Sequence, residues 1–226
     1  MSVDIHIFDR ADRFGAQRPT IDAALSAAVD WVAARADGLS VDVVVAPTDF
    51  GTDQFMNAVA QGPANISMGI DIAALGDPTL YENVRCCMVH ELHHAYRWPH
   101  IPRWSVAECL ILEGLAKIAD IEAFRAAVPD APMPGWTIAN ADAVRDDVER
   151  LKDTAMEDAR DWLYTPEPDA PPHVPMRIYA VGLDLMLRAT HALRLDPWQA
   201  ATRDAATLMA AADTGAATPD DIWCSA

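Results

Sequence analysis

The residues with the clearest chemical potential lie in the segment Val89-His90-Glu91-Leu92-His93-His94-Ala95. It contains the pattern H-E-x-x-H, with His90 and His94 four positions apart. On a helix, side chains at this spacing project from one face, so both imidazoles can bind the same divalent metal ion. Glu91 then lies beside that face, where its carboxylate can accept a proton from a metal-bound water. The pattern predicts a zinc site with the chemistry of a hydrolase.

A third protein ligand is expected, because a catalytic zinc site commonly has two histidines, one carboxylate and an open position for water. Eighteen residues separate His94 from Glu113, enough for the first helix to end near Trp98-Pro99 and for a second helix to return alongside. Gly114 would let the two helices approach closely. Glu108 is the alternative ligand, but it lies five residues from Glu113 and about 140° around the helix. We therefore expect Glu113 to be the third ligand.

The elements that would position these residues fall into two groups. Alternating apolar and polar residues predict strands at 3–8, 41–46 and 65–72, with a helix between the first two. After Gly76-Asp77-Pro78 the pattern predicts helices at about 79–97, 104–127, 139–162, 176–194 and 197–213. Strands followed by helices indicate an α+β fold. We expect a single domain, with a small mixed sheet in residues 1–76 and a mainly helical part in 77–226.

Composition excludes several classes of function. The chain has 226 residues, 51% of them hydrophobic, and carries 17 basic against 34 acidic residues, a formal charge of −17. Such a surplus of negative charge repels nucleic acid. No apolar run is long enough to span a membrane, and the start of the chain lacks the features of a signal peptide. We expect a soluble, cytoplasmic protein with no nucleic-acid or membrane partner.

The remaining polar and sulfur-containing groups are expected to be structural. The acidic helix at 139–162 has apolar residues at helical spacing, so its charges form a solvated face. Four cysteines, at positions 86, 87, 109 and 224, form no C-x-x-C pair and are expected to be reduced thiols, mostly in the core. His93 points about 100° away from His94 and is expected to be packed rather than to bind metal.

Two segments resemble those of a known group of enzymes. His-Glu-Leu-His-His followed, after eighteen residues, by Glu-Gly-Leu-Ala is similar to the gluzincin arrangement of zinc metallopeptidases. It is more similar still to a bacterial family of predicted zinc-dependent proteases with HE-x-H-H and EGLA segments. That family also has a Tyr…Gly segment on a later helix, after a proline-containing loop, and Pro171-Pro172 followed by Tyr179 and Gly182 is similar. The resemblance covers about residues 80 to 190.

The resemblance implies a zincin-like fold and a zinc-dependent hydrolysis of peptide bonds. By this resemblance His90, His94 and Glu113 bind Zn²⁺, Glu91 is the general base, and Tyr179 donates a hydrogen bond to the oxyanion of the tetrahedral intermediate. His173, in the proline-rich loop, is the alternative donor.

The chain departs from the thermolysin-like pattern in one respect. Four residues beyond the zinc glutamate those enzymes have an aspartate that supports a histidine ligand, and this chain has Lys117 there. Asp120 is the candidate to replace it.

Zincins also bind an extended peptide along the edge strand of their sheet, and we expect Asn65 to Ile70 to form this strand.

We therefore predict a zinc metallopeptidase that acts on a peptide or protein substrate. Two alternatives remain open. One is a zinc-stabilised binding or regulatory protein without peptidase activity. The other is a zinc hydrolase of amides or esters other than peptides.

Overall fold

The structure is a computed structural model, and it describes residues 1–51, 55–128, 141–166 and 176–215. The chain forms two compact units. Unit 1 comprises Met1–Pro99 and Ala119–Pro129, and unit 2 comprises His100–Ile118 and Asp130–Ala226. The predicted single domain, divided at residues 76 and 77, stays a prediction.

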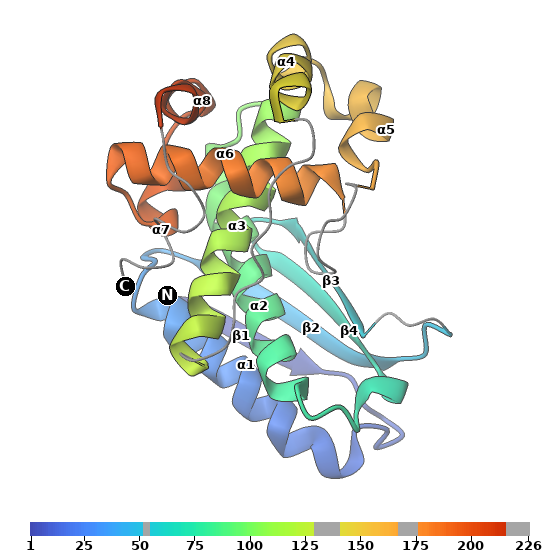
Figure 1. Cartoon of the computed structure of the whole chain (residues 1–226). Helices are drawn as coiled ribbons and strands as arrows, with labels where there is room; N and C mark the ends of the chain where they lie inside the picture. Colours follow the sequence, from blue (N-terminus) through green and yellow to red (C-terminus); the bar gives the residue numbers. More distant parts are fainter. Residues whose placement is uncertain (52–54, 129–140, 167–175, 216–226) are drawn as a thin grey trace. The chain divides into compact units, whose positions relative to one another are not determined.

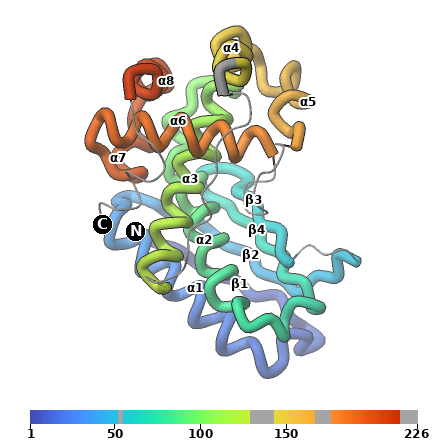
Figure 2. Tube along the Cα trace, in the orientation of Figure 1, coloured from blue at the N-terminus to red at the C-terminus, as the bar shows by residue number. Residues whose placement is uncertain are grey.

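Unit 1 is built on a four-stranded mixed sheet. Its strands are β1 (Ser2–Ile7), β2 (Ser40–Thr48), β3 (Met56–Gly62) and β4 (Asn65–Asp71). They lie in the order β1-β2-β4-β3, with β1, β2 and β4 parallel and β3 antiparallel to β4 (Figure 1). The three predicted strands are confirmed. The chain turns tightly after β3 and returns as β4 (Figure 2).

The position of β4 corrects the prediction that Asn65 to Ile70 form the edge strand. β4 pairs with β2 on one side and with β3 on the other, so its backbone groups are used within the sheet. β3, which was not predicted, lies at that end of the sheet. Its buried face carries small residues such as Ala60, which give a weak strand signal.

Helices α1 (Arg18–Ala33) and α2 (Leu80–Arg97) complete the core of unit 1. The predicted apolar stripe of α1 is confirmed, because Ile21, Leu25, Ala28 and Val32 are all buried. α2 packs against α1 and contacts β3 and β4. On β2, Val41, Val43 and Val45 are buried while the intervening residues are exposed, as the period of two requires. α2 is therefore held between a helix and the sheet.

The helices that follow are α3 (Val106–Ala127), α4 (Ala141–Leu151), α5 (Arg160–Leu163), α6 (Arg177–Leu193), α7 (Pro197–Ala200) and α8 (Ala205–Thr214). Short 3₁₀ turns occur at Gly15–Gln17, Ile72–Ala74, Trp98–His100 and Met156–Ala159. α3 belongs to unit 2 up to Ile118 and to unit 1 from Ala119.

Two predicted helices are shorter than expected. The helix predicted at 139–162 ends at Leu151, where the carbonyls of Lys152 and Thr154 accept hydrogen bonds from the first amides of α3, each at 3.0 Å. These amides have no partner inside α3, so the contact satisfies both elements. The helix predicted at 197–213 is split into α7 and α8, because Asp204 caps a new helix by accepting from the Thr207 amide at 2.8 Å.

The fold class is confirmed as α+β, with a four-stranded sheet followed by a mostly helical half, as in zincins. The H-E-x-x-H segment lies within α2. Among the described residues, no helix has the length and apolar character needed to cross a membrane.

Candidate metal centre

The sheet-facing helix α2 brings the residues of the H-E-x-x-H segment together. The ligand atoms of His90, Glu91 and His94 all lie within 4.8 Å of one another. The three residues are 8%, 7% and 6% exposed, respectively. The two imidazole rings are edge to face, with centroids 4.4 Å apart. The two imidazoles are ligands that suit zinc, and the carboxylate of Glu91 lies beside them.

A carboxylate on α3 holds the first histidine. Asp120 Oδ2 lies 3.0 Å from His90 Nδ1, and both side chains belong to unit 1 and are buried. A carboxylate at Nδ1 places the proton of the neutral ring there and leaves Nε2 to bind a metal. Asp120 therefore supports His90, as predicted from the presence of Lys117 in the usual position of this aspartate.

A backbone group of the sheet holds the glutamate. The amide of Ala60, on β3, donates a hydrogen bond of 2.7 Å to Glu91 Oε2. This contact was not predicted, because a peptide N–H has no signature in the sequence. It connects the expected general base to the edge of the sheet.

Glu113, the expected third ligand, lies in unit 2 and is half-buried on α3. Its charge acts on two neighbours in that unit. Burial, followed by the carboxylates of Glu113 and Glu108, raises the pKa of the Cys109 thiol to about 12. Burial and then the Glu113 carboxylate also raise the pKa of Tyr164.

Tyr164 is thus a second candidate tyrosine, because its pKa is affected by the charge of Glu113, the expected third ligand. It closes α5, just before the proline-rich loop, and is 41% exposed. Tyr179, the predicted hydrogen-bond donor, is half-buried in the first turn of α6. The alternative donor, His173, lies outside the described residues.

Gly114 has a different neighbour from the one expected. A Cβ atom built on it would lie 2.1 Å from the carbonyl oxygen of Gly182, on α6, and a Cβ on Gly182 would lie 2.4 Å from the carbonyl oxygen of Leu110. The two glycines let α3 and α6 cross in close contact within unit 2. The expectation that Gly114 serves an approach to the helix of His94 is replaced by this observed crossing.

The structural assignments of the other candidate groups mostly hold. His93 is fully buried, as expected for a packed side chain. Cys109 is buried, whereas Cys86 and Cys87 are half-buried, and none of these described cysteines forms a disulfide. Cys224 lies outside the described residues.

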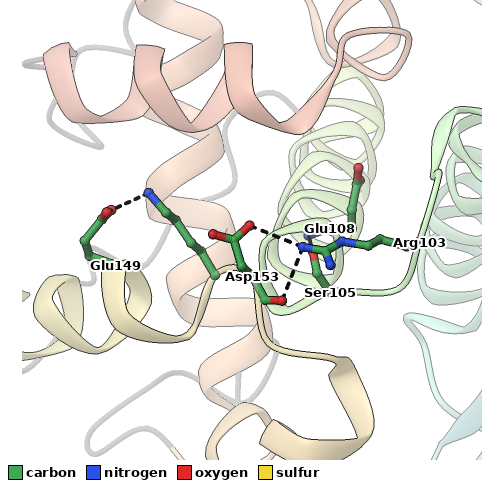
Figure 3. A network of polar contacts seen from close by, with 6 residues as sticks. Arg103, Ser105, Glu108, Glu149 and Asp153 are labelled. Atoms are coloured by element: carbon green, nitrogen blue, oxygen red, sulfur yellow. Dashed lines mark hydrogen bonds and ion pairs between the residues drawn. The ribbon is translucent and has the colours of Figure 1, made fainter.

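Unit 2 also contains a cavity of about 650 Å³, a size that suits a small molecule. Two ion pairs lie at its wall, Arg103 with Asp153 at 3.3 Å and Lys152 with Glu149 at 2.6 Å (Figure 3). The buried Glu108 lines this cavity and Glu113 does not. Glu108 and Glu113 therefore lie in different surroundings, as expected for two side chains about 140° apart around α3.

Comparison with known proteins gives one result. The profile of a family described as predicted Zn-dependent protease (DUF2268) matches residues 22–207. The chain belongs to this family. The match spans most of the chain and includes α2 with its H-E-x-x-H segment, so the resemblance noted in the sequence is confirmed at the level of the family. No curated protein and no solved structure gives a significant match.

Membership agrees with the geometry of the cluster. The family is described as Zn-dependent, and His90, Glu91 and His94 form a buried group that can hold a metal ion. Zinc is therefore the cofactor that both the family and the donor set indicate.

Proposed function

We propose that this chain hydrolyses peptide bonds in a zinc-dependent reaction of the gluzincin type. The observation that carries the proposal is the buried cluster of His90, Glu91 and His94, in which Asp120 supports one histidine and Ala60 supports the glutamate. Polar groups are costly to bury, so a supported cluster of this kind is typical of a functional site. Membership of a family of predicted Zn-dependent proteases adds to this support.

In this proposal His90, His94 and Glu113 are the zinc ligands. Two imidazoles and one carboxylate, with a fourth position open, form a common catalytic set. Glu113 precedes Asp120 by seven residues on α3, which is close to two full turns. The proposed ligand and the aspartate that supports His90 therefore share one face of the helix.

The chemistry divides between the metal and the protein. A zinc ion bound here would polarise the substrate carbonyl and acidify a water molecule. Glu91 would accept the proton of the attacking water and deliver it to the nitrogen of the leaving amine. Tyr179 would donate a hydrogen bond to the oxyanion. The substitution Tyr179→Phe would test this role. Tyr164→Phe is its matched control, because both substitutions remove only a phenol oxygen.

The proposed substrate is an extended peptide, and β3 is the strand proposed to bind it. β3 pairs with β4 on one side, and no other described strand pairs with it on the opposite side. It also carries the amide that contacts Glu91. A peptide added to this edge would form backbone hydrogen bonds close to the general base.

Zinc content measured by elemental analysis tests the ligands. We expect about one zinc ion per wild-type chain, and loss of zinc in His94→Ala and Glu113→Ala. Glu108→Gln is the control for Glu113→Ala and should retain zinc. A wild-type chain that holds no zinc, even after reconstitution, would overturn the proposal.

Hydrolysis of a peptide library tests the activity. We expect Glu91→Gln to retain zinc and to lose hydrolysis by about three orders of magnitude, since it keeps the size of the side chain but removes the base. Panels of small amides and esters, run in parallel, identify a hydrolase of other substrates. A zinc-loaded chain that binds a partner but cleaves none of these compounds would instead be a binding protein.

A further inference from the structure

Glu91 is a residue of α2, and its carboxylate is hydrogen-bonded to the sheet. Its hydrogen bond from the Ala60 amide is buried, spans 31 residues of sequence and has the short length typical of a bond to a charged acceptor. Within the described residues, this is the one hydrogen bond found for the Glu91 side chain. The bond therefore fixes one carboxylate oxygen and leaves the other beside the two histidines.

The regular alternation of β3 directs this amide away from β4, and an irregularity follows directly after Ala60. Ala60 pairs with Ile66 and Gly62 pairs with Asn65, so Gln61 is an extra residue on β3. Such a bulge bends a strand and re-aims its backbone groups, and bulges are frequent beside active sites.

Two further features maintain the bulge. Gly62 has a φ of 156°, a conformation that residues with a side chain rarely adopt. The Gln61 side chain donates a hydrogen bond of 3.2 Å to Ser67 Oγ, on β4. The position of the Ala60 amide is thus built into the strand.

We propose that the peptide N–H of Ala60 is a positioning group for Glu91 in the proposed hydrolysis. A glutamate side chain has several rotatable bonds, and a base that must meet a water molecule gains from being held in a single orientation. The inference rests on the proposed function and adds a residue that acts through the general base. It also limits the substrate, because the Ala60 amide is occupied and cannot pair with a bound peptide.

Hydrogen exchange of backbone amides tests the contact without any measurement of activity. In the wild-type chain we expect the Ala60 amide to be protected, although it lies on the open side of β3. In Glu91→Ala its exchange should accelerate at least tenfold. The Val59 amide, which points toward β4 by the alternation of the strand, is the internal control and should stay protected. Equal exchange of the Ala60 amide in both chains would overturn the proposal.

Removal of the donor tests its effect on catalysis. Proline has no N–H, and an edge strand accepts it where the N–H points away from the sheet. We expect Ala60→Pro to retain zinc and to lower kcat by roughly 10- to 100-fold with a smaller change in KM. Ala58→Pro lies on the same side of the strand without a bond to Glu91, so it should raise KM more than it lowers kcat.

The outcomes separate this proposal from the proposed function. A wild-type kcat in Ala60→Pro would overturn the positioning role and leave the hydrolase intact. Absence of all hydrolysis in the wild-type chain would overturn the proposed function, and the catalytic role of Ala60 with it. The exchange experiment needs no Ala60 variant, so it decides about the bond even if Ala60→Pro does not fold.

Discussion

Helices α2 and α4 are both rich in ionisable residues, yet they use them in opposite ways. α2 buries His90, Glu91 and His94, and the first two have hydrogen-bond partners that lie 30 and 31 residues away in sequence. α4 buries Val144 and Val148 and keeps most of its charges on the surface. Its Arg150 pairs with Asp147, three residues earlier on the same helix.

The difference shows what distinguishes a site from a solvated surface. Exposed pairs three or four residues apart contribute little free energy, because water already solvates both groups. Buried polar groups must instead be satisfied by partners that the fold brings from elsewhere. Long-range support, rather than the number of charges, marks α2 as the functional helix.

The largest effect is expected from a substitution that places a charge on the apolar face of α4. Val148→Asp places a carboxylate at a position that is 4% exposed, and we expect it to lower the free energy of unfolding by about 3 kcal/mol or more. Glu149→Ala, at the next position but exposed, should change it by less than about 0.5 kcal/mol. Urea denaturation measures both, and similar losses would contradict the assignment of the two faces.

A substitution of Asp120 tests the long-range support of α2. Asp120→Ala leaves His90 without its carboxylate, and we expect zinc affinity to fall roughly 10- to 100-fold. The free energy of unfolding of the metal-free chain should fall by about 2 kcal/mol. Asp146→Ala, on the surface of α4, is the control and should change neither quantity appreciably. Unchanged zinc affinity in Asp120→Ala would mean that the contact does not orient the ring.

The Cys109 thiol gives a prediction about pH. Its folded pKa is raised to about 12 by burial and by Glu113 and Glu108, whereas an unfolded thiol titrates near its ordinary value. The folded chain therefore keeps a proton that the unfolded chain loses, so stability is complete below about pH 9 and falls as the pH rises toward 12. Between pH 8 and 10.5 the wild type should lose about 2 kcal/mol more than Cys109→Ala. If the free energies of unfolding of the wild type and of Cys109→Ala changed equally with pH, the thiol would not titrate in this way.

The smallest expected effect concerns the exposed pair of Lys152 and Glu149. Their charged atoms are 2.6 Å apart, but the side chains are 36% and 66% exposed. A double-mutant cycle should give a coupling of about 0.5 kcal/mol or less, and 1 M salt should remove it. A coupling of 2 kcal/mol would weaken the contrast drawn between α4 and α2.

The sequence predicted the parts of the molecule whose signal is local. The helix at 80–97 and its cluster of His90, Glu91 and His94 could be read from spacing alone. Long-range contacts were harder to predict. Asp120 was foreseen only as a candidate, and Ala60 could not be foreseen, because its contact is made by a backbone amide on a strand that has few large apolar residues.

The same limit explains the errors in the fold. The apolar spacing of 139–162 continues past Leu151, but the chain leaves the helix there because the start of α3 offers hydrogen bonds to its carbonyls. β4 was assigned to the edge of the sheet because β3 was missed. Tertiary partners decided these cases against the local pattern.

The continuity of α3 has a consequence for unfolding. This helix supplies residues to unit 2 up to Ile118 and to unit 1 from Ala119, without a break in its 22 residues. A unit that melted alone would have to end the helix in its middle and leave new unpaired groups at the cut. We therefore expect the two units to lose their structure in one cooperative transition, with α3 as the element that couples them.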